Sequence, residues 1–327
     1  MRAVLCRAFG PPESLVVEEL PDPKPGPGQV VVDVACAALN FFDTLIIQNR
    51  YQVKPELPFS PGAEFAGRIS ALGEGVTGLT VGHRVAGYVG YGACRTKVVA
   101  PAGRLIPVPD GLSDEAAAGL LVTYGTSLHA LQDRAKLQPG ETLAVLGASG
   151  GVGLAAVELG AIMGARVIAC ASSPEKLALA RQHGATETLD YSREDLKEGL
   201  KRLTGGKGVD VVYDPVGGDL SEAALRAIAW RGRFLVVGFA AGDIPRIPLN
   251  LMLLKGCDVQ GVFWGSFADK EPVQNAVNIR SIFAWAVEGR VKALVSNVLP
   301  LAETGQGIRL LADRKATGKV VVRMNGA

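Results

Sequence analysis

A glycine-rich turn in the middle of the chain has residue types and spacing that could hold a diphosphate. The apolar run 143–146 is typical of a buried strand, and Gly147, Gly150 and Gly153 follow it three residues apart. After Gly153 the apolar residues recur at helical spacing. Such a turn lets backbone approach a pyrophosphate, while the free N–H groups of the following helix face the anion. The stretch therefore predicts the start of a dinucleotide-binding unit.

The spacing of these glycines departs from the usual fingerprint. The turn reads G-x-x-G-x-x-G rather than G-x-G-x-x-G, and a glycine pattern alone also fits a tight packing turn without a ligand. The order of strand, turn, helix and second strand favours the nucleotide interpretation.

The end of the second predicted strand, 166–171, indicates which dinucleotide would bind. NAD-specific proteins carry Asp or Glu about 20 residues after the glycines, where this chain has Ser172 and Ser173. Ser173 can cap a helix that begins at Pro174 and has Lys176 in its first turn. These groups suit a 2′-phosphate, although an ordinary helix cap with a solvated lysine has the same residues. Because the acid is missing, the balance favours NADPH over NADH.

The composition is that of a globular protein with two domains. The chain has 327 residues, too many for a typical single core, and is 48% hydrophobic and 20% charged. A net charge of +2 is too small to attract nucleic acid or an anionic membrane, so neither partner is expected. The chain has neither a signal-peptide pattern nor a long unbroken apolar run, so we expect a cytoplasmic protein.

The cysteines and histidines are scattered. None of the five cysteines forms a C-x-x-C pair, and none of the three histidines is close in sequence to a cysteine or to another histidine. The cysteines are therefore expected to be small buried hydrophobic residues in a reducing compartment, and no metal site is expected.

The first third of the chain predicts a β-domain. Glycines and prolines punctuate short valine-rich runs there, a pattern typical of strands joined by turns. The predicted strands are 14–19, 29–35, 64–72 and 95–100. A helix is expected over 116–131, interrupted at Tyr124, Gly125 and Thr126.

Strands and helices alternate in the next part of the chain. Beyond 143–146, strands are expected at 166–171, 186–189, 209–213, 234–237 and 259–262, with helices at 175–183, 194–203 and 219–229. The alternation predicts a doubly wound, six-stranded parallel sheet of the Rossmann type. Ligands of such sheets bind at the carboxyl ends of the strands. The glycine-containing segments 214–218 and 238–242 are therefore expected near a cofactor, although each alone also fits a simple turn.

Seven short motifs follow one another along the chain. They are 40–43, 61–67, 81–85, 125–126, 147–153, 214–218 and 318–322. This ordered set resembles the medium-chain dehydrogenase/reductase superfamily, essentially from end to end. Within the superfamily the chain is similar to the zinc-independent NADPH:quinone oxidoreductases, the zeta-crystallin-like family.

The resemblance implies an enzyme without zinc. Where zinc alcohol dehydrogenases of this superfamily have a cysteine ligand and a Gly-His-Glu motif, this chain has Asn40 and Gly62-Ala63-Glu64. The four close cysteines of their structural zinc lobe also have no counterpart. Without a Lewis acid, the acceptor must take hydride readily, as a quinone or an activated alkene does. Asp43 and Glu64 are expected to have structural roles.

The resemblance also implies the domains and the contacts of the cofactor. Residues 1–122 with 264–327 would form a catalytic, chaperonin-10-like (GroES-like) β-barrel, and 123–263 the NADPH-binding Rossmann domain, with the nicotinamide in the cleft between them. The implied contacts are Asn40 and Thr126 at the nicotinamide, the backbone of Val216, Gly238 and Phe239 beside it, Gly150, Gly151 and Val152 at the pyrophosphate, and Ser172, Ser173, Lys176, Tyr191 and Lys315 at the 2′-phosphate and adenosine end.

Direct hydride transfer from NADPH to a small molecule is the expected chemistry, with the protein supplying orientation. An enoyl substrate would also need a proton donor, and Tyr51 is in a region that resembles the tyrosine region of enoyl thioester reductases. Tyr51 could equally just line the pocket. Three functions stay open. The protein could be a quinone reductase, a reductase of α,β-unsaturated carbonyls or enoyl thioesters, or a non-catalytic NADPH-binding protein. The last predicted strand, 259–262, leaves an unpaired edge of the sheet. Pairing of this edge with a second copy would form a homodimer, which we therefore expect.

Overall fold

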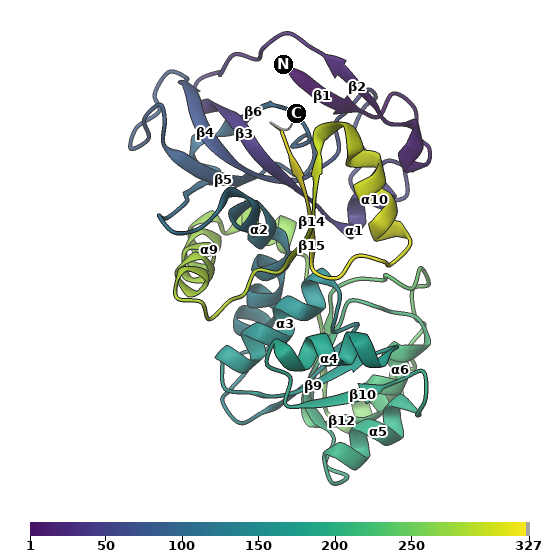
Figure 1. Ribbon diagram of the computed structural model, residues 1–327. Coiled ribbons are helices and arrows are strands. Elements are labelled where there is room, and N and C mark those ends of the chain that lie inside the picture. Colours follow the sequence, from purple (N-terminus) through teal and green to yellow (C-terminus); the bar gives the residue numbers. More distant parts are fainter. Residues whose placement is uncertain (325–327) are drawn as a thin grey trace. The chain divides into compact units, whose positions relative to one another are not determined.

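The computed structural model describes residues 1–324, which fall into two compact units. Unit 1 comprises residues 1–122 and the described residues from 268 on, and unit 2 comprises Thr123–Phe267. In unit 1 strands from the first and last parts of the described chain lie side by side, as the purple and yellow ribbons in Figure 1 show.

Unit 2 contains a six-stranded sheet whose strands are all parallel. Its strands are β8 (Thr142–Leu146), β9 (Arg166–Ala171), β10 (Glu187–Asp190), β11 (Val209–Asp214), β12 (Ile228–Val236) and β13 (Asp258–Gly261). Their order across the sheet is β10-β9-β8-β11-β12-β13, which in chain order is 3-2-1-4-5-6. This is the order of the doubly wound dinucleotide-binding fold, as the sequence predicted. It places the reversal of strand order between β8 and β11.

The apolar sequences of β8 and β9 explain why these strands lie in the middle of the sheet. Every residue of β8 is buried, and so are five of the six in β9, because helices cover both faces of a parallel sheet. The helices of unit 2 are α3 (Gly151–Ile162), α4 (Pro174–Gln182), α5 (Leu196–Leu203), α6 (Asp219–Arg226) and α7 (Asn250–Lys255). One continuous core joins the sheet to α5, α6 and α7.

Two sequence predictions about elements were wrong. Helix α2 (Asp114–Leu128) runs without interruption through Gly125 and passes into a π-helical turn, η3 (His129–Arg134). Gly125 is needed for close packing, because a Cβ there would lie 2.8 Å from the ring of Trp264. Strand β12 begins at Ile228, in a stretch assigned to helix, and accommodates Arg231 at a φ of 61° and a register shift against β11.

Unit 1 is built mainly of strands. These are β1 (Arg2–Leu5), β2 (Val16–Glu19), β3 (Gln29–Leu39), β4 (Glu64–Leu72), β5 (Arg84–Tyr88), β6 (Lys97–Pro101), β7 (Leu105–Pro107), β14 (Val295–Pro300) and β15 (Lys319–Arg323). The order β14-β15-β3-β4-β5-β7 forms one sheet, β6 pairs with β3, and β1 pairs with β2. Because β15 pairs with β3, the C-terminal segment completes a sheet begun by the first third of the chain.

Of the helices whose described residues lie wholly in unit 1, only α9 is long. They are α1 (Phe41–Ile46), α9 (Pro272–Val287) and α10 (Thr304–Ala312), with single 3₁₀ turns η1 (Pro12–Ser14), η2 (Ala102–Arg104) and η4 (Leu301–Glu303). Helix α8 (Trp264–Lys270) follows β13. No helix within residues 1–324 has the length and apolar character needed to cross a membrane.

Candidate functional site

The glycine turn between β8 and α3 has the geometry of a close-approach loop. Gly147 has a φ of 58°, in the left-handed region that favours glycine. A Cβ on Gly153 would lie 2.2 Å from the carbonyl oxygen of Gly147, so only glycine fits there. Gly150 is the N-cap residue of α3, and the first-turn N–H groups from Gly151 onward have no partner within the helix. The turn therefore offers donors to an anion at a point where backbone is bare.

A buried carboxylate shapes the loop that follows β11. Asp214 accepts hydrogen bonds from the N–H groups of Val216, at 2.8 Å, and Gly217, at 2.9 Å, and from the hydroxyl of Ser221. Burial raises the pKa of Asp214 above its usual range. The carboxylate thus fixes the backbone of Val216, a predicted cofactor contact, and this role of Asp214 was not predicted from the sequence.

The loops after β11 and β12 lie against each other and against the glycine turn. The N–H of Ala241 donates to the carbonyl oxygen of Val216 at 2.8 Å. A Cβ on Gly217 would lie 3.0 Å from the ring of Phe239, and one on Gly147 would lie 2.9 Å from Cγ2 of Val216. The structure therefore brings together Gly147, Val216 and Phe239, with Gly238 beside Phe239, at the carboxyl end of the sheet.

Helix α2 contacts the first turn of α3 through a residue that sequence reasoning missed. The hydroxyl of Ser127 lies 2.9 Å from the carbonyl oxygen of Val152 and 2.8 Å from the hydroxyl of Tyr213. All three groups are in unit 2. Thr126 precedes Ser127 and is buried, so this predicted contact residue is near the glycine turn.

The second predicted group lies at the carboxyl end of β9. Ser173 caps α4 by accepting a hydrogen bond from the N–H of Lys176, and the ammonium of Lys176 donates to the Ser172 hydroxyl at 3.4 Å. Tyr191 is held nearby, because its N–H donates to the carbonyl oxygen of Ala171 at 3.1 Å. Lys176 forms no ion pair with a carboxylate in the described part of the chain. The cluster can therefore receive an added phosphate without first breaking an ion pair.

Unit 1 contains a buried ionic cluster centred on a lysine. The Lys319 ammonium donates to the carbonyl oxygen of Leu39 at 3.0 Å, to Oδ1 of Asn40 at 2.7 Å and to Oε1 of Glu64 at 2.7 Å. Glu64 is fully buried and also accepts from Nδ2 of Asn40, at 2.9 Å, and from the N–H of Val122, at 2.6 Å. All three protons of the ammonium thus have acceptors.

The cluster fixes the orientation of the Asn40 amide. Lys319 offers only donors and Glu64 only acceptors, so the amide oxygen must face Lys319 and the amide nitrogen Glu64. No role was predicted for Lys319 from the sequence. A lysine at the head of an otherwise apolar strand was the available signal, since such a residue is buried only when it is paired.

Asp43 lies beside this cluster and organises backbone. Its carboxylate accepts from the N–H of Asn40 at 2.8 Å and from that of Gly62 at 2.9 Å. Burial raises the pKa of Asp43 to about 6, because desolvation outweighs these hydrogen bonds. Both contacts hold main chain in place.

The two remaining predicted residues are also in unit 1. Tyr51 is half-buried and stacks on Phe42 with ring centroids 5.3 Å apart, and burial raises its pKa, so the phenol keeps its proton at neutral pH. Lys315 is exposed and pairs with Asp313 at 3.3 Å. Lys315 is in unit 1, whereas the residues at the end of β9 are in unit 2, and the predicted contact of Lys315 with the adenosine end stays a prediction.

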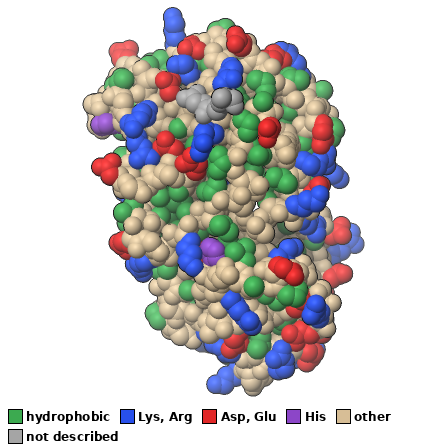
Figure 2. All heavy atoms as spheres, in the orientation of Figure 1, with side chains coloured by type: hydrophobic (Ala, Val, Ile, Leu, Met, Phe, Trp, Pro, Cys, Tyr) green, Lys and Arg blue, Asp and Glu red, His purple; other side chains and the backbone are tan. Residues whose placement is uncertain are grey.

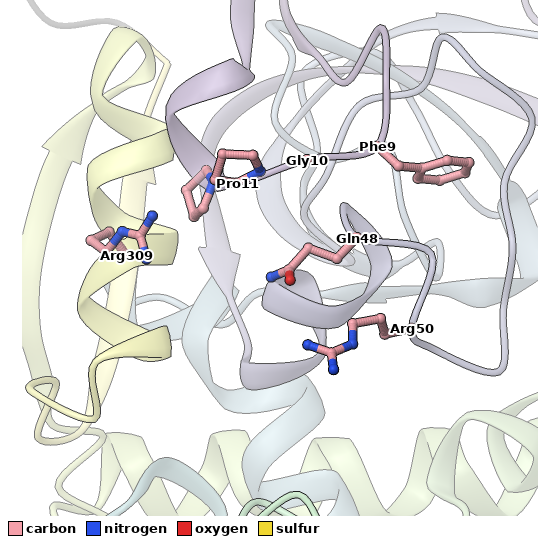
Figure 3. A pocket seen from close by; sticks show the side chains of 7 residues that line it. Phe9, Gly10, Pro11, Gln48, Arg50 and Arg309 are labelled. Atoms are coloured by element: carbon pink, nitrogen blue, oxygen red, sulfur yellow. The ribbon is translucent and has the colours of Figure 1, made fainter.

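A surface hollow of about 440 Å³ opens in unit 1, and none of the predicted site residues lines it. Figure 3 shows Gln48, Arg50 and Arg309 around it, next to the loop that contains Phe9. Arg309 is neutralised by Glu13, at 2.8 and 2.6 Å, and Arg50 is exposed. The hollow thus lacks a buried polar group waiting for a ligand.

Neither the surface charge nor the cysteines indicate a further site. Basic and acidic side chains are interspersed over the face shown in Figure 2. All five cysteines are buried, and burial raises the pKa of each thiol, that of Cys36 to about 12. No group of three or more His, Cys, Asp or Glu side chains that could hold a metal ion occurs among residues 1–324.

Comparisons with known proteins cover both units. A family model described as "Alcohol dehydrogenase GroES-like domain" matches residues 26–110, and one described as "Zinc-binding dehydrogenase" matches 151–279. A quinone oxidoreductase-like protein 2 homolog from Nematostella vectensis is 40% identical over 325 residues, covering 98% of this chain and 88% of that protein. Quinone oxidoreductase-like protein 2 of Bos taurus is 39% identical over 324 residues, covering 99% and 92%.

A solved structure agrees with these relatives. The Escherichia coli quinone oxidoreductase complexed with NADPH has a TM-score of 0.93 to this chain at 27% identity, covering 99% of this chain and 100% of that one. The GroES-like match and this structure confirm the predicted fold class, a Rossmann sheet with a second GroES-like domain. The chain belongs to the quinone oxidoreductase family of the medium-chain dehydrogenase/reductase superfamily.

Proposed function

We propose that this oxidoreductase transfers hydride from NADPH to a quinone, without zinc. The observation that carries the proposal is the carboxyl end of the unit 2 sheet, where a bare glycine turn lies between β8 and α3 and hydroxyls with an ammonium follow β9. The names of the relatives and the NADPH bound in the Escherichia coli structure support it.

The chain's own residues would act by binding and orientation. NADPH, when bound, supplies the hydride. The N–H groups of Gly150, Gly151 and Val152 would hold the pyrophosphate at the start of α3. The backbone of Val216 and Phe239, fixed by Asp214 and by the loop-to-loop hydrogen bond, would bound the nicotinamide end.

The hydroxyls and the ammonium that follow β9 would favour NADPH over NADH. Ser172, Ser173 and Lys176 would receive the 2′-phosphate, with Tyr191 at the adenosine end. On the resemblance stated above, Asn40 and Thr126 contact the nicotinamide, and this stays a prediction. So does the assignment of Lys315.

Replacing Lys176 tests the cofactor assignment. We expect Lys176→Ala to weaken NADPH binding about tenfold or more, because a charge-assisted contact to phosphate is lost, and to leave NADH nearly unchanged. Fluorescence titration of both nucleotides measures the difference. The matched control is Lys207→Ala, an exposed lysine of unit 2 that precedes β11 and therefore lies at the amino end of the sheet, opposite the carboxyl end of β9. Equal losses for NADPH and NADH in Lys176→Ala would contradict the assignment.

A second candidate function is the reduction of an α,β-unsaturated carbonyl or enoyl thioester. The observation in its favour is the protonated, half-buried phenol of Tyr51, which can donate to a developing enolate. A quinone needs no such positioned donor to accept hydride.

Tyr51→Phe separates the two candidates. If an enone is the substrate, the variant is expected to lose about 100-fold or more in kcat, since a positioned general acid contributes that much. With a quinone the rate should stay within about twofold of the parent. Steady-state oxidation of NADPH at 340 nm with both acceptor types gives the answer. An equal fall with both acceptors would assign Tyr51 to the pocket wall.

A third candidate is NADPH binding without turnover. Tight NADPH binding with no oxidation across a panel of quinones and enones would favour it. The same panel is the test of the proposed function, because turnover of at least one quinone is its direct consequence.

A second copy of this chain is the partner we propose. Strand β13 is at the edge of the sheet, and large apolar side chains near it are exposed, among them Leu253 at 80%, Leu254 at 68% and Trp230 at 68%. Patches of this kind mark interaction surfaces, and an unpaired edge strand can extend a sheet into a partner. A monomeric mass in light scattering at micromolar concentration would contradict the dimer.

A further inference from the structure

A second pocket of unit 1 differs from the hollow in Figure 3 in the state of its charges. It has a volume of about 360 Å³, within the usual range for small-molecule sites. Valines, prolines and the rings of Tyr88 and Tyr91 make its apolar wall, and Arg95, Lys97 and Arg104 supply its charge. Among the described residues that line it there is no carboxylate.

Arg95 is the unusual member of this set. Its Nε is buried without a hydrogen-bond partner, and among residues 1–324 no carboxylate forms an ion pair with its guanidinium. The guanidinium lies against Gly92, where an added Cβ would be 3.3 Å from one of its nitrogens. Burial lowers the pKa of Arg95, as expected for a cation taken out of water without an opposite charge.

The other two cations are already neutralised. Lys97 pairs with Asp33 at 2.9 Å and with Asp22 at 3.5 Å, and Arg104 pairs with Asp269 at 2.9 Å. The pocket therefore carries one uncompensated positive charge, on a side chain whose planar fork suits carboxylate, sulfonate or phosphate oxygens.

We propose that this pocket binds the anionic group of a small organic acid, with Arg95 as the anchor and the tyrosine and valine side chains against its apolar body. Tyr88 connects the pocket to the proposed chemistry, because β5 pairs it with Glu64 of β4, whose carboxylate accepts a hydrogen bond from the amide of Asn40. The pocket would thus hold the charged end of an acceptor and make Arg95 a specificity-determining residue. This last step rests on the proposed function.

Two acceptors that differ by one charge test the proposal. In Arg95→Met we expect the KM for 1,4-naphthoquinone-2-sulfonate to rise about tenfold or more, because a charge-assisted contact is lost. The KM values for neutral 1,4-naphthoquinone and for NADPH should stay within about twofold of the parent. Arg95→Lys, which keeps the charge without the fork, should fall between the two and guards against misfolding of the methionine variant.

The control variant is Arg50→Met, which removes the same charge from the hollow of Figure 3. It should leave the ratio of the KM values for the sulfonated and the neutral quinone unchanged. If Arg50→Met raises the KM for the sulfonated quinone relative to that for the neutral one, or if Arg95→Met leaves this ratio unchanged, the anion does not bind at Arg95 and the proposal is overturned.

Binding without turnover separates this inference from the proposed function. Isothermal titration of the parent with 2-naphthalenesulfonate, which cannot be reduced by hydride, should show binding that Arg95→Met removes. If that result appears while neither quinone is reduced, the anion-binding pocket is supported and the proposed quinone reduction is contradicted. Absence of heat with the parent protein would overturn the pocket itself.

Discussion

Gly153→Ala is expected to lose NADPH binding and to unfold at a lower temperature than the parent protein. The added methyl group would lie 2.2 Å from the carbonyl oxygen of Gly147, which is backbone and cannot rotate away. Either the turn or the first turn of α3 must shift, which costs about 1–3 kcal/mol or more by the usual penalty of overpacking. The N–H groups at the start of α3 move with it, so the proposed pyrophosphate site is lost. Thermal unfolding and fluorescence titration with NADPH measure both effects.

Gly150→Ala, in the same turn, separates ligand binding from folding. A Cβ there would meet only the carbonyl oxygen of Gly147 at 3.5 Å, an ordinary contact, and its φ of −75° suits alanine. We expect its thermal midpoint to match that of the parent. NADPH affinity should still fall about tenfold, because Gly150 is the glycine proposed to let a pyrophosphate approach the backbone. Unchanged affinity in Gly150→Ala would place the dinucleotide elsewhere.

Lys319→Met is expected to destabilise unit 1 by about 3–5 kcal/mol, the usual result of breaking a buried ion pair from one side. The Glu64 carboxylate, which is fully buried, would keep only the amide of Asn40 and the N–H of Val122 as donors. Chemical denaturation followed by circular dichroism measures the loss.

A double-mutant cycle shows whether the pair is the cause. Glu64→Gln with Lys319→Met should cost less than the sum of the two single changes, because the second change removes the stranded charge. The matched control is Lys97→Met, which breaks a more exposed pair with Asp33 and should cost no more than about 1 kcal/mol. Additive single effects would mean that Lys319 and Glu64 act independently.

The sequence predicted the unit 2 sheet well because its signal is local. The central strands β8 and β9 are short apolar runs, and Gly147, Gly150 and Gly153 mark the first crossover. The errors arose where tertiary packing overrides local preference. Gly125 was interpreted as a helix break, whereas the indole of Trp264, more than a hundred residues later, requires a residue without a side chain there.

The candidate site was predictable in part for the same reason. Ser172, Ser173 and Lys176 are neighbours in sequence, so their cluster follows from one helix cap. The cluster of Asn40, Glu64 and Lys319 joins residues up to 279 positions apart, and no local pattern announces it. Arg95 was missed because an unpaired charge is a property of its surroundings in the fold, where each neighbouring cation has found an acid.

The burial of the thiols has a consequence for the proposed reduction of quinones. Quinones are electrophiles, and they arylate cysteine only as the thiolate, at sulfur that solvent can reach. In this chain every cysteine is out of solvent and holds its proton more tightly than a free thiol does. A catalyst built in this way can work in excess acceptor without being alkylated by it.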